Sequence, residues 1–152
     1  MRADTDTHTP LGQAPMLGDL ALANQIEAYN LPMGSISRII RSAAAKQPGH
    51  ITTVGFGTFI DPKYGGGKIN AKTTEDIVTE IEVYGKKYLI YKAFPINVAI
   101  IRATTADPAG NCTFERESLY NDNLTQAMAA RASGGVVLVQ VNVFLFSIPV
   151  YS

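Results

Sequence analysis

Two helical segments, each followed closely by a β-branched strand, constrain the fold of this 152-residue chain most strongly. The first is a helix over 35–46, with Ser35 as its N-cap, followed by a strand over 50–56. The second is a helix over 123–133 followed by a strand over 136–141. Helices that lead directly into strands favour parallel pairing beneath helical cover. The pattern predicts an α/β fold with an open, mixed, largely parallel sheet flanked by helices.

Shorter patterns occupy the remaining chain. A helix is expected over 16–24 and a short alternating strand over 26–30. The segment 79–93 alternates twice about Gly85, which predicts a hairpin. Residues 97–102 form an apolar run typical of a buried strand. These elements fit a layered domain with a sheet at its centre.

Charge and cysteine content exclude several classes of function. Thirteen Lys and Arg residues balance 13 Asp and Glu residues, so the chain has no excess of positive charge for binding nucleic acid. The single cysteine, Cys112, excludes an internal disulfide and a zinc site of the CxxC type. Two separated histidines suggest no metal site. We therefore expect a cytoplasmic protein that binds neither metal nor nucleic acid.

The two ends of the chain differ in composition from its middle. Residues 1–10 form a polar tail without the apolar stretch of a secretory signal. The apolar stretch after Val136 contains Gln, Asn, Ser and Pro, so no membrane-spanning helix is expected there. Its last part, 142–152, is an atypical apolar tail without charge. The expected organisation is therefore one partial domain over 11–141 between two tails.

Four ordered segments carry a resemblance to a known family. They read IEAYNLPMGSISRIIRS (26–42), PGHITTVGFGTFIDPKYGGGKIN (48–70), INVAIIRATTADPAGNCTFE (96–115) and ASGGVVLVQV (132–141). Together they resemble the family I coenzyme A transferases, specifically the acetate or propionate (short-chain acyl) group. Because the segments keep their order and spacing, they are far more specific than any single motif.

The resemblance implies a truncated first domain and a reaction. Such enzymes move coenzyme A from an acyl-CoA to a carboxylate such as acetate, through a glutamyl-CoA thioester. The nucleophilic glutamate lies in a second domain, so no catalytic residue is assigned to this chain, and the isolated chain is expected to be inactive. Coenzyme A enters as a thioester substrate, with no permanently bound cofactor. The implied partners are a second domain or subunit, and a homo-oligomer is expected.

Two glycine-containing segments are the candidate substrate-binding regions. In the first, Met33 and Gly34 stand where the family usually has Gln followed by Gly, at a helix N-terminus. The second is the loop 55–68, a mobile wall of the acyl pocket in this interpretation. Its candidate residues are Gly57, Thr58, Phe59, Gly65 and Gly66. An ordinary turn and a flexible surface loop are the alternatives for these segments.

Other chemistry-bearing residues are interpreted structurally. Glu115 and Glu117 are expected to cap or to pair with Arg102 or Arg116, and Cys112 to pack as a small hydrophobic residue. A second function stays open beside the enzymatic one. The chain could be a truncated, non-catalytic remnant, or a binding or interaction module with the same fold.

Overall fold

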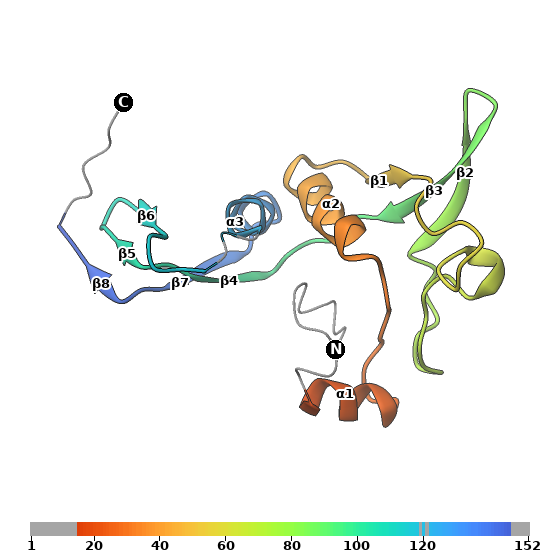
Figure 1. Ribbon diagram of the computed structural model, residues 1–152, viewed down its shortest axis with the longest axis horizontal. Helices are drawn as coiled ribbons and strands as arrows, with labels where there is room; N and C mark the ends of the chain where they lie inside the picture. Colours follow the sequence, from red (N-terminus) through yellow and green to blue (C-terminus); the bar gives the residue numbers. More distant parts are fainter. Residues whose placement is uncertain (1–14, 119, 121, 147–152) are drawn as a thin grey trace. The chain divides into compact units, whose positions relative to one another are not determined.

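A computed structural model describes residues 15–118, 120 and 122–146, and their contacts divide them into two compact units (Figure 1). Unit 1 holds the described residues of 1–42 and 47–94, and unit 2 those of 43–46 and 95–152. The predicted boundary between residues 10 and 11 lies outside the described residues. Unit 1 has one sheet and unit 2 has two among the described residues, so each unit is described separately.

Unit 1 is built on a three-stranded antiparallel sheet in the order β1-β3-β2. The strands are β1 (Gly49–Thr52), β2 (Val78–Val83) and β3 (Lys86–Lys92). The hairpin predicted around Gly85 is confirmed, and Tyr84 and Gly85 both adopt positive φ (50° and 73°). Positive φ at both central residues is the requirement of a tight hairpin turn whose twist matches its strands.

The strand expected over 50–56 is shorter, and its pairing is not parallel. β1 ends at Thr52 and pairs antiparallel with β3, from Gly49 opposite Lys92 to Thr52 opposite Leu89. The chain then turns into the glycine-rich loop, where Gly55 has φ of 110°. A conformation of that kind cannot continue a strand, so the strand cannot reach residue 56 as predicted.

The helices of the first half start earlier than predicted. α1 spans Pro15–Leu22, and α2 spans Met33–Ala44. Ser35 is therefore inside α2 rather than at its N-cap. Within the helix, Ser35 is 3% exposed and hydrogen-bonds the Tyr91 hydroxyl. The carbonyl of Pro32 accepts the N–H groups of Ser35 and Ile36, which moves the start of the helix toward Pro32.

The predicted strand over 26–30 is extended chain with only an isolated bridge between Tyr29 and Lys68. The bridge comes from the last residue of the glycine-rich loop, and the surrounding contacts come from the segment after it. The Thr73 hydroxyl accepts from the N–H of Ala28 and donates to its carbonyl. Side-chain bonds thus replace the neighbouring strand that an alternating pattern normally requires.

Unit 2 contains a parallel pair of strands, the kind of pairing predicted for the strand after the second helix. β4 (Val98–Arg102) and β7 (Val136–Gln140) are parallel, in a register that places Val98 opposite Val136. α3 (Asn123–Ala132) contacts both strands, and its Ala129 and Ala130 are fully buried (Figure 1). This confirms the helix-then-strand prediction for the second segment, because a crossover helix covers a parallel pair.

A second small sheet in unit 2 involves the predicted apolar tail. Its order is β6-β5-β8, from Cys112–Thr113, Thr105–Ala106 and Val143–Phe144. β5 pairs antiparallel with β6 and parallel with β8. Residues 143–144 therefore continue the ordered fold past 141. Among the described residues, three α-helices accompany one antiparallel sheet, one parallel pair and one mixed sheet, so the chain has the α/β fold that its sequence predicts.

Candidate functional site

The glycine-rich loop of unit 1 is organised around the buried side chain of Asp61, which is 4% exposed. One carboxylate oxygen accepts the N–H of Gly57 at 3.0 Å, and the other accepts the N–H of Lys63 at 3.1 Å. Asp61 caps the short 3-10 helix η2 (Pro62–Tyr64), and its own carbonyl accepts the N–H groups of Tyr64 and Gly66. One residue thus fixes both halves of the loop.

The same bonds set the electrostatics of the loop. The N–H groups of Gly57 and Lys63 hold the pKa of Asp61 below its ordinary value, against the opposing effect of burial. The carboxylate is therefore ionised at neutral pH and serves as an acceptor only. The sequence interpretation treats this loop as a mobile wall, whereas its contacts describe a segment with many internal hydrogen bonds.

The loop is joined to the segment that leads into α2. The carbonyl of Gly67 accepts the N–H of Asn30 at 2.8 Å, while the N–H of Gly67 donates to the carbonyl of Phe59. A side chain at Gly67 would meet the Asn30 carbonyl at 2.9 Å and Leu31 at 3.1 Å. This close approach requires glycine, and it brings the Phe59 region and the start of α2 into one hydrogen-bonded assembly.

Most of the predicted substrate-binding residues are exposed. Met33 is 63% exposed at the first turn of α2, and Gly34 next to it is exposed as well. In the loop, Gly57, Thr58 and Phe59 are exposed. The structure thus leaves both predicted segments accessible and connects them through Gly67.

The triple glycine has less free hydrogen-bonding capacity than its sequence suggests. Gly65 is exposed, but Gly66 is buried. The N–H groups of Gly66, Gly67 and Lys68 donate to the carbonyls of Asp61, Phe59 and Gly65, respectively. Because these donors are engaged within the loop, they do not form a cradle for phosphate.

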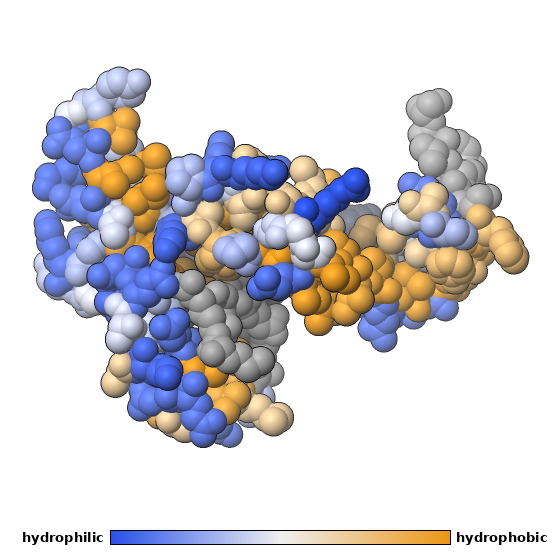
Figure 2. All heavy atoms as spheres, turned by 180° about the vertical axis from the view of Figure 1, so that it is seen from behind, coloured by the Kyte–Doolittle hydropathy of each residue, from blue (hydrophilic) through white to orange (hydrophobic). Residues whose placement is uncertain are grey.

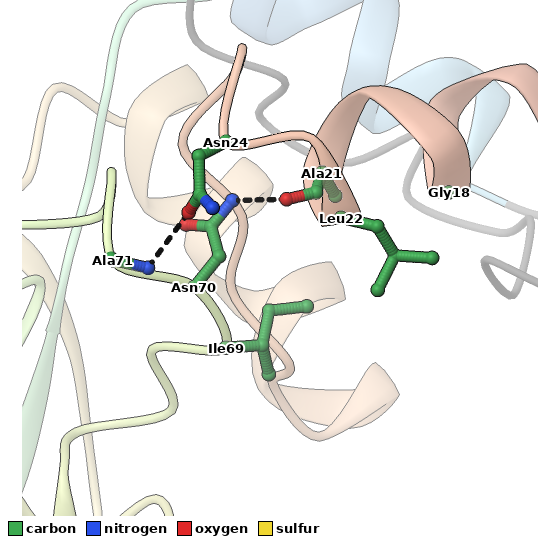
Figure 3. A pocket seen from close by; sticks show the side chains of 7 residues that line it. All are labelled: Gly18, Ala21, Leu22, Asn24, Ile69, Asn70 and Ala71. Atoms are coloured by element: carbon green, nitrogen blue, oxygen red, sulfur yellow. Dashed lines mark hydrogen bonds between the residues drawn. The ribbon is translucent and has the colours of Figure 1, made fainter.

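A hollow that the sequence interpretation missed lies beside α1 (Figure 3). Its volume is about 520 Å³, and its lining comes from Gly18, Ala21 and Leu22 of α1, from Asn24 and from residues 69–71. The Asn70 amide donates to the carbonyls of Ala21 and Ile26, and the Asn24 side-chain oxygen accepts the N–H of Ala71. None of the predicted site residues lines it. Asn70 is the last residue of the GGGKIN motif. A single asparagine adds nothing to a hydrophobic pattern, so the sequence did not indicate this role.

The remaining candidates in unit 2 have structural partners. Glu117 pairs with Arg102 at 3.7 Å, as predicted, and Glu115 accepts the Thr105 hydroxyl at 3.2 Å. The pKa of Glu115 is lowered, chiefly by the neighbouring Thr113 hydroxyl. Cys112 is half-buried rather than buried, and burial raises the pKa of its thiol. A raised thiol pKa disfavours the reactive thiolate.

Metal-ligating side chains stay apart in the described part of the chain. No three His, Cys, Asp or Glu side chains gather there in a way that could hold a metal ion. His50 lies in β1, where its pKa is lowered mainly by burial and further by the charge of Arg38.

Within the described part of the chain, every helix is too short or too polar to span a membrane.

Comparison with known proteins identifies the family. A family model described as coenzyme A transferase matches residues 4–145. The chain belongs to the coenzyme A transferase family. The caffeate CoA-transferase of Acetobacterium woodii is 50% identical over 131 residues, which cover 86% of this chain and 25% of that enzyme. The alpha subunit of a probable coenzyme A transferase of Bacillus subtilis is 34% identical over 130 residues, covering 86% of this chain and 51% of its own length.

A solved structure also resembles this coenzyme A transferase chain. The acyl-CoA transferase YdiF of Escherichia coli O157:H7, crystallised as a thioester complex with CoA, superimposes with a TM-score of 0.88 at 45% identity. The match covers 92% of this chain and 27% of YdiF. This chain therefore spans about a quarter of the length of YdiF and of the caffeate CoA-transferase.

Proposed function

We propose that this chain forms part of the first domain of an enzyme that transfers coenzyme A from a short-chain acyl-CoA to a carboxylate such as acetate. The observation that supports this most is the likeness to acetate CoA-transferase YdiF, 48% identical over 130 residues. The chain would act together with a second CoA-transferase domain or subunit. One relative is named as a separate alpha subunit, and this name supports such a division.

In the proposed reaction, a glutamate outside this chain attacks the acyl-CoA thioester. The acyl–sulfur bond breaks as the glutamate oxygen bonds to the acyl carbon, which gives an acyl–glutamyl anhydride and the CoA thiolate. The thiolate then attacks the glutamyl carbonyl, so a glutamyl–sulfur bond forms, the glutamyl C–O bond breaks, and the acyl group leaves as a carboxylate that keeps one glutamate oxygen. The second carboxylate then reverses the exchange and departs as the new acyl-CoA. The isolated chain, without that glutamate, would catalyse neither half of the reaction.

This chain would contribute the acyl side of the pocket. We assign Met33 and Gly34, at the start of α2, and Gly57, Thr58 and Phe59, in the loop ordered by Asp61, to the substrate-facing surface. Their exposure and the Gly67 connection support this assignment. Gly65 would lie at its margin. Gly66 is buried and hydrogen-bonded, so it would shape the loop without contacting substrate.

The position of the covalent intermediate tests the proposal. In a chimera, residues 11–141 of this chain replace the matched segment of E. coli YdiF, and the purified protein is incubated with acetyl-CoA. We expect its intact mass to rise by one CoA minus one water, with the adduct on a glutamate in the YdiF part. An adduct on a residue of this chain, or a folded chimera without any adduct, would refute the proposal.

A further inference from the structure

β8 ends its sheet with an open, apolar edge. Among the described residues it is the last strand in the order β6-β5-β8, and it pairs with β5 alone. Its residues Val143 and Phe144 are 44% and 66% exposed, and the next two residues, Leu145 and Phe146, are 43% and 100% exposed. Figure 2 shows apolar side chains gathered over the strands of unit 2. We call residues 143–146 the β8 edge.

The side chains of the β8 edge lack the protection that exposed strands normally carry. Soluble proteins guard such edges with charged side chains, above all lysine, or with proline. No charged residue follows Arg131 in the sequence, and residues 143–146 contain no proline. An unguarded, apolar edge is a template for pairing with another strand, so its expected occupant is a strand rather than a helix or a small molecule.

The backbone of the β8 edge determines which groups are open to a further strand. The N–H groups of Val143 and Leu145 donate to carbonyls in and beside β5, at 3.1 and 2.8 Å. Because the amides of successive strand residues point to opposite sides, the N–H and C=O of Phe144 point away from β5. A strand that continues past Leu145 directs the same groups of Phe146 to the open side as well.

The sequence of the β8 edge is self-complementary. Residues 144–146 read Phe-Leu-Phe in both directions, so an antiparallel copy can place Leu145 opposite itself and Phe144 opposite Phe146. In that register Phe144 and Phe146 form the hydrogen-bonded pairs, and Leu145 forms the non-hydrogen-bonded pair at the centre. The hydrogen-bonding groups of this register are those that point away from β5. Phenylalanines opposite one another on a single face also stabilise the pairing.

We propose that the β8 edge pairs with the β8 edge of a second copy of this chain, antiparallel and centred on Leu145. Each copy contributes the same residues, so the contact is isologous and closes at two chains. The pairing joins the β6-β5-β8 sheets of the two copies into one continuous sheet. This inference goes beyond the proposed function, and its test includes no measurement of CoA transfer.

Interchain disulfides test the register. Leu145→Cys and the matched control Phe144→Cys are each made in the full chain with Cys112→Ala, which removes the single native thiol. In the proposed register the two Cα atoms at position 145 lie about 4.5 Å apart, within reach of a disulfide, whereas those at position 144 lie about 7–8 Å apart, beyond it. On oxidation we expect at least about tenfold more covalent dimer from the 145 variant on non-reducing gels.

Sedimentation velocity tests the same pairing without a covalent bond. The double variant F144K/F146E places opposite charges across the pair, and the matched variant F144K/F146K places like charges there. We expect F144K/F146K to dimerise at least about tenfold more weakly than F144K/F146E. Because both phenylalanines are mostly exposed in the single chain, neither variant loses core packing, and circular dichroism checks the fold.

Four results would overturn the inference. They are a wild-type chain that sediments as a monomer at every concentration, equal disulfide formation at positions 144 and 145, equal self-association of the two double variants, and growth into assemblies larger than a dimer. Equal self-association would indicate contact without the antiparallel register, and larger assemblies would indicate an edge that does not close.

Discussion

Gly67 joins the glycine-rich loop to the chain that enters α2, and replacing it with alanine should break that connection. Gly67 has φ of 77° and Gly57 has φ of 70°, so alanine meets a similar backbone penalty at both positions. A Cβ at Gly57 would contact nothing within 4 Å, whereas at Gly67 it would lie 2.9 Å from the Asn30 carbonyl. Gly57→Ala is therefore a matched control that isolates the steric effect.

The magnitudes follow from these two environments. The left-handed conformation costs alanine about 1–2 kcal/mol, and the stiffer unfolded chain returns about 0.4–1 kcal/mol. Gly57→Ala should therefore lower the free energy of unfolding by at most about 1.6 kcal/mol. Gly67→Ala must also displace Asn30 and weaken its 2.8 Å hydrogen bond to Gly67, which adds about 1–3 kcal/mol.

Urea unfolding followed by far-ultraviolet circular dichroism measures both variants, since the chain has no tryptophan for fluorescence. We expect Gly67→Ala to be less stable than Gly57→Ala by about 1–3 kcal/mol. A difference below about 0.5 kcal/mol, the usual margin of such comparisons, would refute the inference that this contact connects the two segments.

Two further predictions concern the same loop and the start of α2. Because backbone N–H groups hold the pKa of Asp61 below 3.8, its carboxylate stabilises the fold above about pH 4, and this stabilisation is lost as the pH falls through the folded pKa. Asp61→Asn should therefore lose less stability than the wild type between about pH 7 and pH 2.5 in urea titrations; parallel profiles would contradict this. Met33→Gln should raise kcat for acetyl-CoA and acetate in the YdiF chimera, because an amide donates a hydrogen bond and a thioether does not. Met33→Leu is the control, and an unchanged kcat in the glutamine variant would argue against a substrate-facing position.

Local patterns predicted the elements whose partners are near in sequence. The hairpin at Gly85 and the helix before β7 each follow from periodicity and turn residues within a short window. Parallel pairing was also predicted for the strand that follows the second helix, and the structure shows that its partner is β4.

Long-range contacts account for what the sequence did not predict. The antiparallel partner of β1 is β3, and nothing in residues 50–56 identifies it. Ser35 has the residue type of an N-cap, but the Pro32 carbonyl accepts its N–H and α2 begins at Met33, so Ser35 lies inside the helix. The hydrogen bonds of Asp61 and Asn70 arise only once the loop is closed, so the loop residues could be named while the groups that order them could not.

Isotope exchange between labelled acetate and acetyl-CoA tests the central claim most directly. The YdiF chimera, the parent YdiF and the isolated chain are compared at equal concentration, with circular dichroism as the control for folding. We predict exchange by the chimera at a rate within about tenfold of the parent, equivalent to about 1.4 kcal/mol in the barrier, and none by the isolated chain. A folded chimera without exchange, or exchange by the isolated chain alone, would contradict the account.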